Sequence, residues 1–328
     1  MKKIFFTLLK LVIVFSILIY LVYSGRLNFE KFLLFRESPG ILAFMIFVLV
    51  LIVVPLATFR WWLLLRAIGL PVEPKQTFLL TWIGNFFNTT LPGAFTGDVV
   101  KGYYVIKAQQ KEGRTPALMT LLIDRFVGLF GLIVMSFLAL VFNFELILSQ
   151  ENMHSLAWMI AALFLFTMLF YVIAMFPFKD GHDPFINLFK RLPGSKLSIK
   201  VYSAFKKYQH QKKILILTLG LAIGIHSMIA LIFFQLAHLI GLEDMNLATQ
   251  FFLMPIGLIT VAIPIAPGGI GIGHAAFESL YQLAGLSGGA DIFNIFIIVQ
   301  LGIFLLGGIP YFLYSSEYKI PENKDKII

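Results

Sequence analysis

The chain has 328 residues, of which 59% are hydrophobic and 13% are charged, and its mean hydropathy is +0.88. Soluble domains are usually about half apolar and about a quarter charged, so this composition excludes most soluble enzymes and disordered proteins. The absence of cysteine excludes thiol nucleophiles, thiolate metal sites and disulfides. The net charge of +9 is compatible with nucleic-acid binding or with basic cytoplasmic loops on a membrane protein.

Six apolar runs are each long enough to span a membrane, which takes about 20 helical residues. In chain order they cover residues 4–23, 41–59, 118–142, 156–176, 214–240 and 292–314. The first run follows a short basic start and resembles a signal peptide. It is longer than a typical signal-peptide core, however, and no small-x-small cleavage site ends it. We therefore predict that it is retained as a first span.

Two further apolar runs, 77–91 and 247–266, are interrupted by proline and glycine. The first ends at Pro92-Gly93, and the second contains Pro255 and Pro264 and is followed directly by Pro267-Gly268-Gly269. Broken backbone at membrane depth is tolerated only inside protein or beside a wet cavity. A short amphipathic segment follows each run, so each could be a kinked span, a re-entrant hairpin or an interfacial helix pair.

The distribution of basic residues favours two re-entrant hairpins over two further spans. With a cytoplasmic N-terminus, this topology places only Arg26, Lys31 and Arg36 in outside loops and Lys10 in the first span. The other lysines and arginines then lie inside, many of them in a cytoplasmic basic loop at 178–213, as the positive-inside rule requires. We expect that loop to form an amphipathic helix lying on anionic lipids. An interfacial helix pair would satisfy the same count.

We therefore predict a single all-α polytopic membrane domain over 1–328, with about six full spans, two re-entrant helical hairpins and both termini cytoplasmic. The chain also looks duplicated, because residues 41–142 and 214–315 share the order span, hairpin, span. Since the two hairpins enter from opposite sides, this is an inverted-topology repeat. Transporters with such repeats bind substrate at the repeat interface near the midplane.

The first hairpin carries polar residues that could bind a lipid head group. Asp98 and Lys101 share a helix face just after a Pro-Gly break, where free backbone N–H groups attract anions. The simpler interpretation is that Asp98 caps this helix and Lys101 faces cytoplasmic water. The other candidates of this hairpin are Asn85, Asn88, Pro92, Gly93 and Gly97.

Asp124 and Arg125 lie about one turn inside the third span, where charges are costly and usually face a cavity or a partner. Neighbouring residues point about 100° apart on a helix, so the two side chains should find different partners. Arg125 could meet Asp98 or a phosphate, and Asp124 could meet Lys101. Alternatively, both side chains extend to the cytoplasmic interface.

The second hairpin tip is rich in glycine and is followed by two titratable residues. His274 and Glu278 are four residues apart and share a helix face, so they could relay protons or bind a head group. The candidates of this tip are Pro267, Gly268, Gly269, Gly271, His274 and Glu278. His226 and His238 lie on the fifth span. They could be functional residues or could equally well form hydrogen bonds between helices.

These motifs together resemble the lysylphosphatidylglycerol synthase transmembrane (flippase-like) family. The resemblance rests on residues 85–104, on Ile123-Asp124-Arg125-Phe126-Val127-Gly128-Leu129 and on residues 264–286, and it covers about 5–315. The family often has Arg at the position of Lys101 and an Arg-Glu pair at Gly273-His274. No aminoacyl-transferase domain follows residue 315, so that activity is not carried over. The resemblance implies an inverted-repeat fold, paired re-entrant helices and lipid handling in the cytoplasmic membrane of a prokaryote.

We therefore expect a flippase-like transporter of a phospholipid or polyprenyl-phosphate-linked lipid, not an enzyme, with no metal or other cofactor. Lys101 and Arg125 would hold the phosphate. One alternative is an integral-membrane transferase acting on a lipid-linked sugar, with Asp98 or Asp124 as base. Another is a non-catalytic partner of a lipid-modifying enzyme. The expected partners are membrane lipids with anionic head groups, with a homo-oligomer also open and no nucleic acid.

Overall fold

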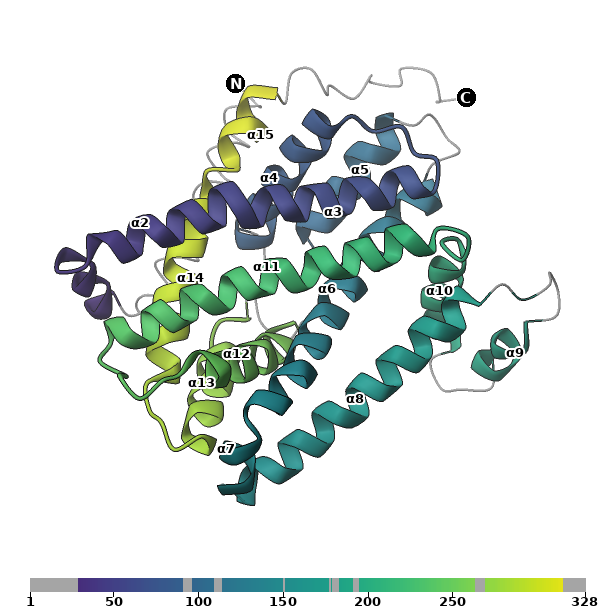
Figure 1. The fold of residues 1–328 in the computed structure, drawn as a ribbon. Helices are drawn as coiled ribbons and strands as arrows, with labels where there is room; N and C mark the ends of the chain where they lie inside the picture. The colour runs from purple at the N-terminus through teal and green to yellow at the C-terminus, as the bar shows by residue number, and fades with distance from the viewer. Residues whose placement is uncertain are drawn as a thin grey trace.

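The computed structural model describes residues 29–90, 96–108, 114–149, 151–176, 178, 183–190, 195–262 and 269–314 (Figure 1). Throughout these residues the regular structure is helical. The first half comprises η1 (Glu30–Arg36), α2 (Pro39–Phe47), η2 (Val48–Val53), α3 (Val54–Ala67), α4 (Pro74–Thr90), α5 (Thr96–Ala108), α6 (Arg114–Phe142) and α7 (Phe144–Ser149). The second half comprises α8 (Glu151–Met175), α9 (Pro184–Lys190), α10 (Ser195–Lys206), α11 (Lys212–Leu239), α12 (Leu247–Val261), α13 (Ile272–Leu283), α14 (Gly289–Leu305) and α15 (Gly308–Tyr314).

Five helical segments are long and apolar enough to cross a membrane: Pro39–Ala67, Pro116–Phe142, Met153–Met175, Lys212–Leu239 and Gly289–Leu313. They coincide with the second to sixth predicted spans, which confirms an all-α polytopic membrane protein. The predicted first span, 4–23, lies outside the described residues. Within Pro39–Ala67 the helix widens to a π-helix, Val48–Val53, just before Pro55. A proline has no N–H for the usual i→i−4 hydrogen bond. This explains why the backbone hydrogen bonds change from the α-helical to the π-helical pattern just before Pro55.

The two predicted hairpins are present as shorter helices packed among the spans. The longest of them, α4, has 17 residues and is about 25 Å long, whereas the hydrocarbon core is about 30 Å thick. Helix α4 packs against α5, α3 and α14, and α12 packs against α13, α11 and α6. Burial among the spans on several sides favours re-entrant hairpins over helices lying at the interface.

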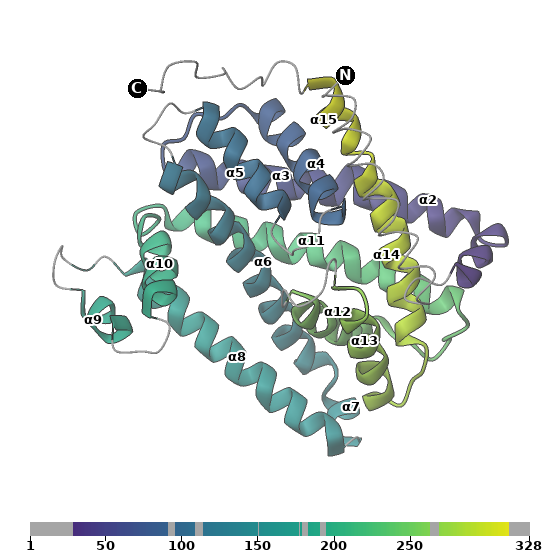
Figure 2. The ribbon, with the colours of Figure 1, turned by 180° about the vertical axis from the view of Figure 1, so that it is seen from behind.

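The two hairpins lie on opposite sides of the molecule in Figure 1, with α4 and α5 towards the top and α12 and α13 towards the bottom. Helices α3 and α11 cross the molecule between them. The packing is reciprocal, because α12 of the second half packs on α6 of the first, and α4 of the first half packs on α14 of the second. Figure 2 shows the same pairing from behind. The arrangement has the element order that the sequence predicted for an inverted repeat; the bounds 41–142 and 214–315 stay predictions.

In the basic loop, helix α10 packs on other helices of the protein rather than on lipid as expected. The apolar face of this amphipathic helix, which includes Tyr202 and Phe205, is buried against α6 and α8, and Tyr208 just after the helix is buried as well. The Tyr208 hydroxyl donates to the carbonyl oxygen of Leu64 at 3.0 Å. The expectation that this face lies on lipid is therefore wrong, because the aromatic residues that make the helix amphipathic fill a gap between spans.

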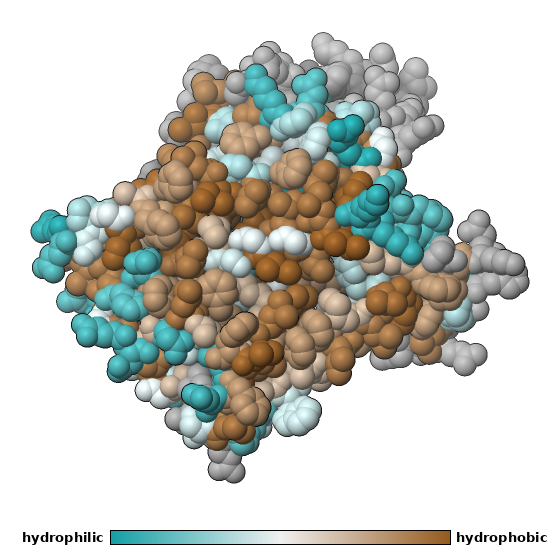
Figure 3. All heavy atoms as spheres, in the orientation of Figure 1, coloured by the Kyte–Doolittle hydropathy of each residue, from teal (hydrophilic) through white to brown (hydrophobic). Residues whose placement is uncertain are grey.

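The outer surface is apolar where a membrane would surround it. Figure 3 shows apolar side chains over the middle of the molecule and polar ones gathered towards its ends. On α8, for example, Trp158 and Phe166 are 77% and 70% exposed. Burying such side chains in lipid rather than water is favourable, which fits a membrane-embedded bundle.

Candidate functional site

Three helices bring five charged side chains together beside the first hairpin. Asp98, near the start of α5, is 8% exposed, and Lys101 one turn later is 9% exposed. The Lys101 Nζ lies 3.0 Å from the Asp98 Oδ1, and the Arg125 Nε on α6 donates to the Asp98 Oδ2 at 2.6 Å. Desolvation by burial would raise the pKa of Asp98, but the two cations outweigh it and lower that pKa, so the carboxyl group stays ionised.

The second ion pair of this cluster joins α3 and α6. The Arg60 guanidinium donates to both carboxylate oxygens of Asp124, at 2.8 Å from Nε and 3.2 Å from the second terminal nitrogen. The hypothesis that Asp124 meets Lys101 is therefore wrong. Because Asp124 and Arg125 point in different directions on α6, Asp124 faces α3 while Arg125 faces α5. We call Arg60, Asp98, Lys101, Asp124 and Arg125 the ionic network.

Lys101 is held inside the protein rather than in cytoplasmic water. Its ammonium group lies 4.7 Å from the centre of the Trp61 ring, a cation–π distance. Its methylenes occupy the space beside Gly84 on α4, where an added Cβ would come within 2.7 Å of the Lys101 Cδ. The Trp61 indole N–H is itself fixed by a 3.2 Å hydrogen bond to the Thr120 hydroxyl. Helices α3, α4 and α5 thus all contribute to a single lysine pocket.

Asn88 takes the capping role that the sequence suggested for Asp98. Its Oδ1 accepts the Gly97 N–H at 2.8 Å, so this N–H group is not free for an anion. Gly97 lies so close to α4 that an added Cβ would sit 1.9 Å from the Gly84 carbonyl oxygen. Asn85 is half-buried, and its carbonyl oxygen accepts from the Thr89 hydroxyl at 2.9 Å. Pro92 and Gly93 lie outside the described residues.

The candidates of the second hairpin make local contacts and do not join the ionic network. The His274 Nδ1 accepts the Gly271 N–H at 3.3 Å, so its Nε2 donates to the Asn294 Oδ1 at 3.4 Å. Glu278 accepts from the Ala290 N–H at 3.1 Å, where it stabilises the start of α14. His274 and Glu278 therefore have separate partners rather than forming the proposed proton relay.

The backbone at the second hairpin tip adopts positive φ angles, which favour glycine. Gly269 and Gly271 have φ values of +70° and +89°, which side chains disfavour. Pro267 and Gly268 lie outside the described residues.

Sequence reasoning did not single out Arg60, Trp61 and Gly84 as part of this site. A signal for Arg60 was present, because it lies within the long apolar segment Pro39–Ala67 rather than after it. An intramembrane charge needs a partner, and Asp124 is the matching acid. Nothing in the sequence marks Gly84, since its role depends on the close approach of α5.

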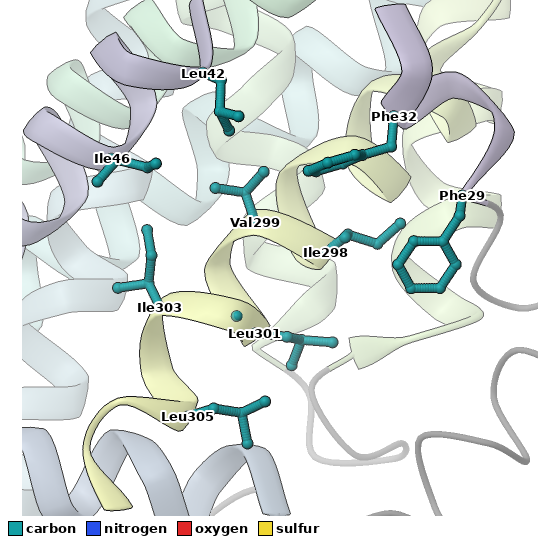
Figure 4. Close-up of a pocket in the computed structure, with 10 residues that line it drawn as sticks. Phe29, Phe32, Leu42, Ile46, Ile298, Val299, Leu301, Ile303 and Leu305 are labelled. Atoms are coloured by element: carbon teal, nitrogen blue, oxygen red, sulfur yellow. The ribbon is translucent and has the colours of Figure 1, made fainter. Parts of the chain in front are cut away.

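A separate surface cavity of about 450 Å³ lies between α14 and the η1–α2 region (Figure 4). The side chains labelled there, such as Phe32, Leu42 and Val299, are apolar. An apolar lining offers a phosphate no hydrogen bond or charge, so this cavity is not a head-group site. The ionic network, by contrast, offers an anion three cationic side chains.

Helical spans, paired short helices and an ionic network that is buried except at Arg125 define a polytopic membrane module with a polar site. The model of the family described as the lysylphosphatidylglycerol synthase TM region matches residues 7–307, so the chain belongs to this family. This family is a membrane module of lipid-related function. The chain is also similar to a "UPF0104 membrane protein" of Methanothermobacter thermautotrophicus, with 21% identity over 314 residues, 88% of this chain and 90% of that protein. No solved structure matches the chain.

Proposed function

We propose that this protein is a flippase-like transporter that moves a polar lipid, a phospholipid or a polyprenyl-phosphate-linked lipid, between the leaflets of a prokaryotic cytoplasmic membrane. The observation that carries the proposal is the ionic network, which lies at a helix hairpin packed among membrane spans. Buried charges in a membrane are costly and are usually kept for function. A lipid head group is the polar cargo that a membrane itself supplies.

The charge of the network suits a phosphate diester. Arg60, Lys101 and Arg125 supply three positive charges, and Asp98 and Asp124 supply two negative ones. One phosphate diester would balance the remaining positive charge. Lipids with one net negative charge are therefore the preferred substrates of this proposal.

Arg125 is the residue that a head group would meet first. Its side chain is 44% exposed, whereas those of Arg60 and Lys101 are 10% and 11% exposed. Its guanidinium can give two parallel hydrogen bonds to a phosphate. Lys101 would keep Asp98 neutralised while Arg125 turns to the ligand. This changes the role of Lys101 from phosphate ligand to internal counter-ion.

The carboxylates support transport over sugar transfer. A general base must accept a proton from its substrate and works best when its pKa lies near the operating pH. Both carboxylate oxygens of Asp98 and of Asp124 already contact a cation of the protein, so neither group presents an unoccupied oxygen to a substrate proton.

Reconstitution tests the proposal. Phosphatidylcholine liposomes with and without the purified protein receive tail-labelled phosphatidylglycerol or tail-labelled phosphatidylcholine, and a membrane-impermeant reductant bleaches the outer leaflet. We expect the protein to expose the inner-leaflet label, and faster for phosphatidylglycerol. Bleaching that stops at the outer leaflet for both lipids, with and without a pH gradient, would contradict transport of phospholipids. The same assay with a labelled sugar joined to a polyprenyl phosphate, which is also a phosphate diester, tests the other lipid class.

A further inference from the structure

The turn that joins α10 to α11 carries positive charge that the protein itself does not neutralise. From Pro184 to Leu242 the sequence contains eight lysines and arginines and no aspartate or glutamate. Lys207, Lys212 and Lys213 are exposed, and none of the three pairs with an acid in the described parts of the chain. We call residues 206–213 the basic turn. Such a concentration of one sign of charge attracts an anion from outside the protein.

The basic turn is held in a fixed place against the membrane spans. Tyr208 is fully buried, and its hydroxyl donates to the carbonyl oxygen of Leu64 on α3 at 3.0 Å. The Lys206 ammonium lies 3.4 Å from the Asp183 carboxylate and also donates to the Gln209 Oε1 at 3.2 Å. The exposed lysines therefore project from an anchored turn, which gives them a defined position.

The basic turn borders a surface hollow that fits a phosphate head group. The hollow has a volume of about 440 Å³, within the range of small-molecule sites. Its lining residues are Gln209, His210, Gln211, Lys212 and Lys213. The amide and ammonium groups among them can donate hydrogen bonds to phosphate oxygens, and none of these five residues is an acid that would repel a phosphate. A hydrophilic patch on the right of Figure 3 lies where α11 begins in Figure 1.

The position of the hollow along α11 indicates where its ligand comes from. This helix has 28 residues and is about 42 Å long, whereas the hydrocarbon core is about 30 Å thick. Centred in the membrane, it extends about 6 Å past the hydrocarbon at each end. Lys212 and Lys213 begin the helix, so they lie in the layer of lipid head groups. The phosphates of membrane lipids are the anions concentrated in that layer.

We propose that the basic turn binds the phosphate head group of an anionic phospholipid that stays beside the protein and is not its cargo. The site is separate from the ionic network, because it belongs to the connection between α10 and α11 whereas the network lies on α3, α5 and α6. It also differs in charge, since no acid balances its lysines. The bond is electrostatic, and it does not depend on whether the protein transports lipid.

Native mass spectrometry of the full-length protein in detergent tests the proposal by measuring lipid binding. Phosphatidylglycerol or phosphatidylcholine is titrated into protein freed of lipid. The variant Lys212→Gln with Lys213→Gln removes two charges from the hollow, and Arg36→Gln with Lys75→Gln removes two exposed charges elsewhere. We expect the first variant to bind phosphatidylglycerol at least about tenfold more weakly, and the second to bind it as the wild type does. Equal binding by the wild type and the first variant would overturn the proposal.

Two further measurements separate charge from packing and lipid from a soluble anion. Lys212→Arg with Lys213→Arg keeps both charges and should retain wild-type binding, so a loss equal to that of the Gln variant would contradict an electrostatic site. Sodium phosphate and sodium chloride at equal ionic strength should weaken lipid binding equally, because both act by screening. A larger effect of phosphate would show that the hollow takes a soluble anion and would overturn the lipid assignment.

A background variant separates this site from the proposed transport site. In Arg125→Gln, substitution of Lys212 and Lys213 by Gln should lower the phosphatidylglycerol affinity by the same factor as in the wild type, since distant sites act independently. Disappearance of the lysine effect in that background would mean that the two sites are one. Absence of lipid movement in liposomes would contradict the proposed function and leave lipid binding at the basic turn unchanged.

Discussion

At the scale of single residues, the site depends on how each buried charge is neutralised. Arg60 and Asp124 form a two-bond pair between α3 and α6, with side chains only 10% and 14% exposed. Such a pair adds little net stability compared with apolar packing, but removal of one partner leaves the other charge buried and unpaired. The pair therefore ties the position of α3 to that of α6.

Substitution Arg60→Gln should lower the free energy of unfolding by about 3 kcal/mol, because it leaves the Asp124 carboxylate buried without its cation. Thermal unfolding of the purified protein in detergent measures the loss. The double variant Arg60→Gln with Asp124→Asn should recover most of the stability, since no unpaired charge remains.

The matched control is Arg66→Gln on the same helix. Arg66 is exposed, and its guanidinium lies over the Trp62 ring at 4.9 Å, so its loss should cost no more than about 1 kcal/mol. Equal destabilisation by the two single substitutions would mean that the Arg60–Asp124 pair has no special structural role.

Sequence reasoning predicted the charged residues of the site better than their partners. Arg125 meets Asp98, which was one of the two predicted options, because α5 and α6 are consecutive helices that pack on each other. The prediction that Asp124 pairs with Lys101 was wrong. Its actual partner, Arg60, depends on the packing angle of α3 against α6. That angle is set by side chains distributed over several helices and leaves no local pattern.

At the scale of elements, the first hairpin depends on contact between the backbones of α4 and α5. The sequence predicts these two helices from an apolar run and the short amphipathic segment that follows the Pro-Gly break. It does not predict that Gly84 and Gly97 would meet, because a glycine at a helix contact looks like any other glycine in a sequence that contains 26. The structure shows that this contact also leaves room for the Lys101 side chain.

Substitution Gly97→Ala should cost about 3 kcal/mol or more, because the new methyl group would lie 1.9 Å from the Gly84 carbonyl oxygen and force the two helices apart. Gel filtration and thermal unfolding in detergent provide the measurement. Gly220→Ala on α11 is the control, since nothing lies within 4 Å of its added Cβ; it should be neutral or stabilise the helix by up to about 1 kcal/mol. Wild-type stability of Gly97→Ala would show that α4 and α5 are not in close contact.

At the scale of the whole molecule, the distribution of lysines and arginines between the loops predicts the orientation in the membrane. The sequence could predict the spans and the paired hairpins because apolar length and Pro-Gly breaks are local features. It could not predict that α10 packs on α6 and α8, since an amphipathic helix looks the same whether lipid or protein covers its apolar face. The structure decides this through the burial of Tyr202 and Phe205.

The orientation can be tested directly because the chain contains no cysteine. Single substitutions Glu243→Cys and Gln211→Cys place a thiol at two exposed positions, one in each predicted compartment. We expect an impermeant maleimide to label Glu243→Cys in intact cells and Gln211→Cys only after permeabilisation. The opposite labelling pattern would invert the topology, and with it the leaflet that each hairpin faces.

The most direct test of the lipid site compares the initial rates at which Arg125→Gln and Arg36→Gln move labelled phosphatidylglycerol in reconstituted liposomes. Both substitutions remove one exposed arginine, but only Arg125 belongs to the ionic network. With both variants folded, we predict that Arg125→Gln moves this lipid at least tenfold more slowly, corresponding to about 1.4 kcal/mol of lost stabilisation, whereas Arg36→Gln keeps the wild-type rate. Equal rates for the two variants would contradict a phosphate site at the ionic network.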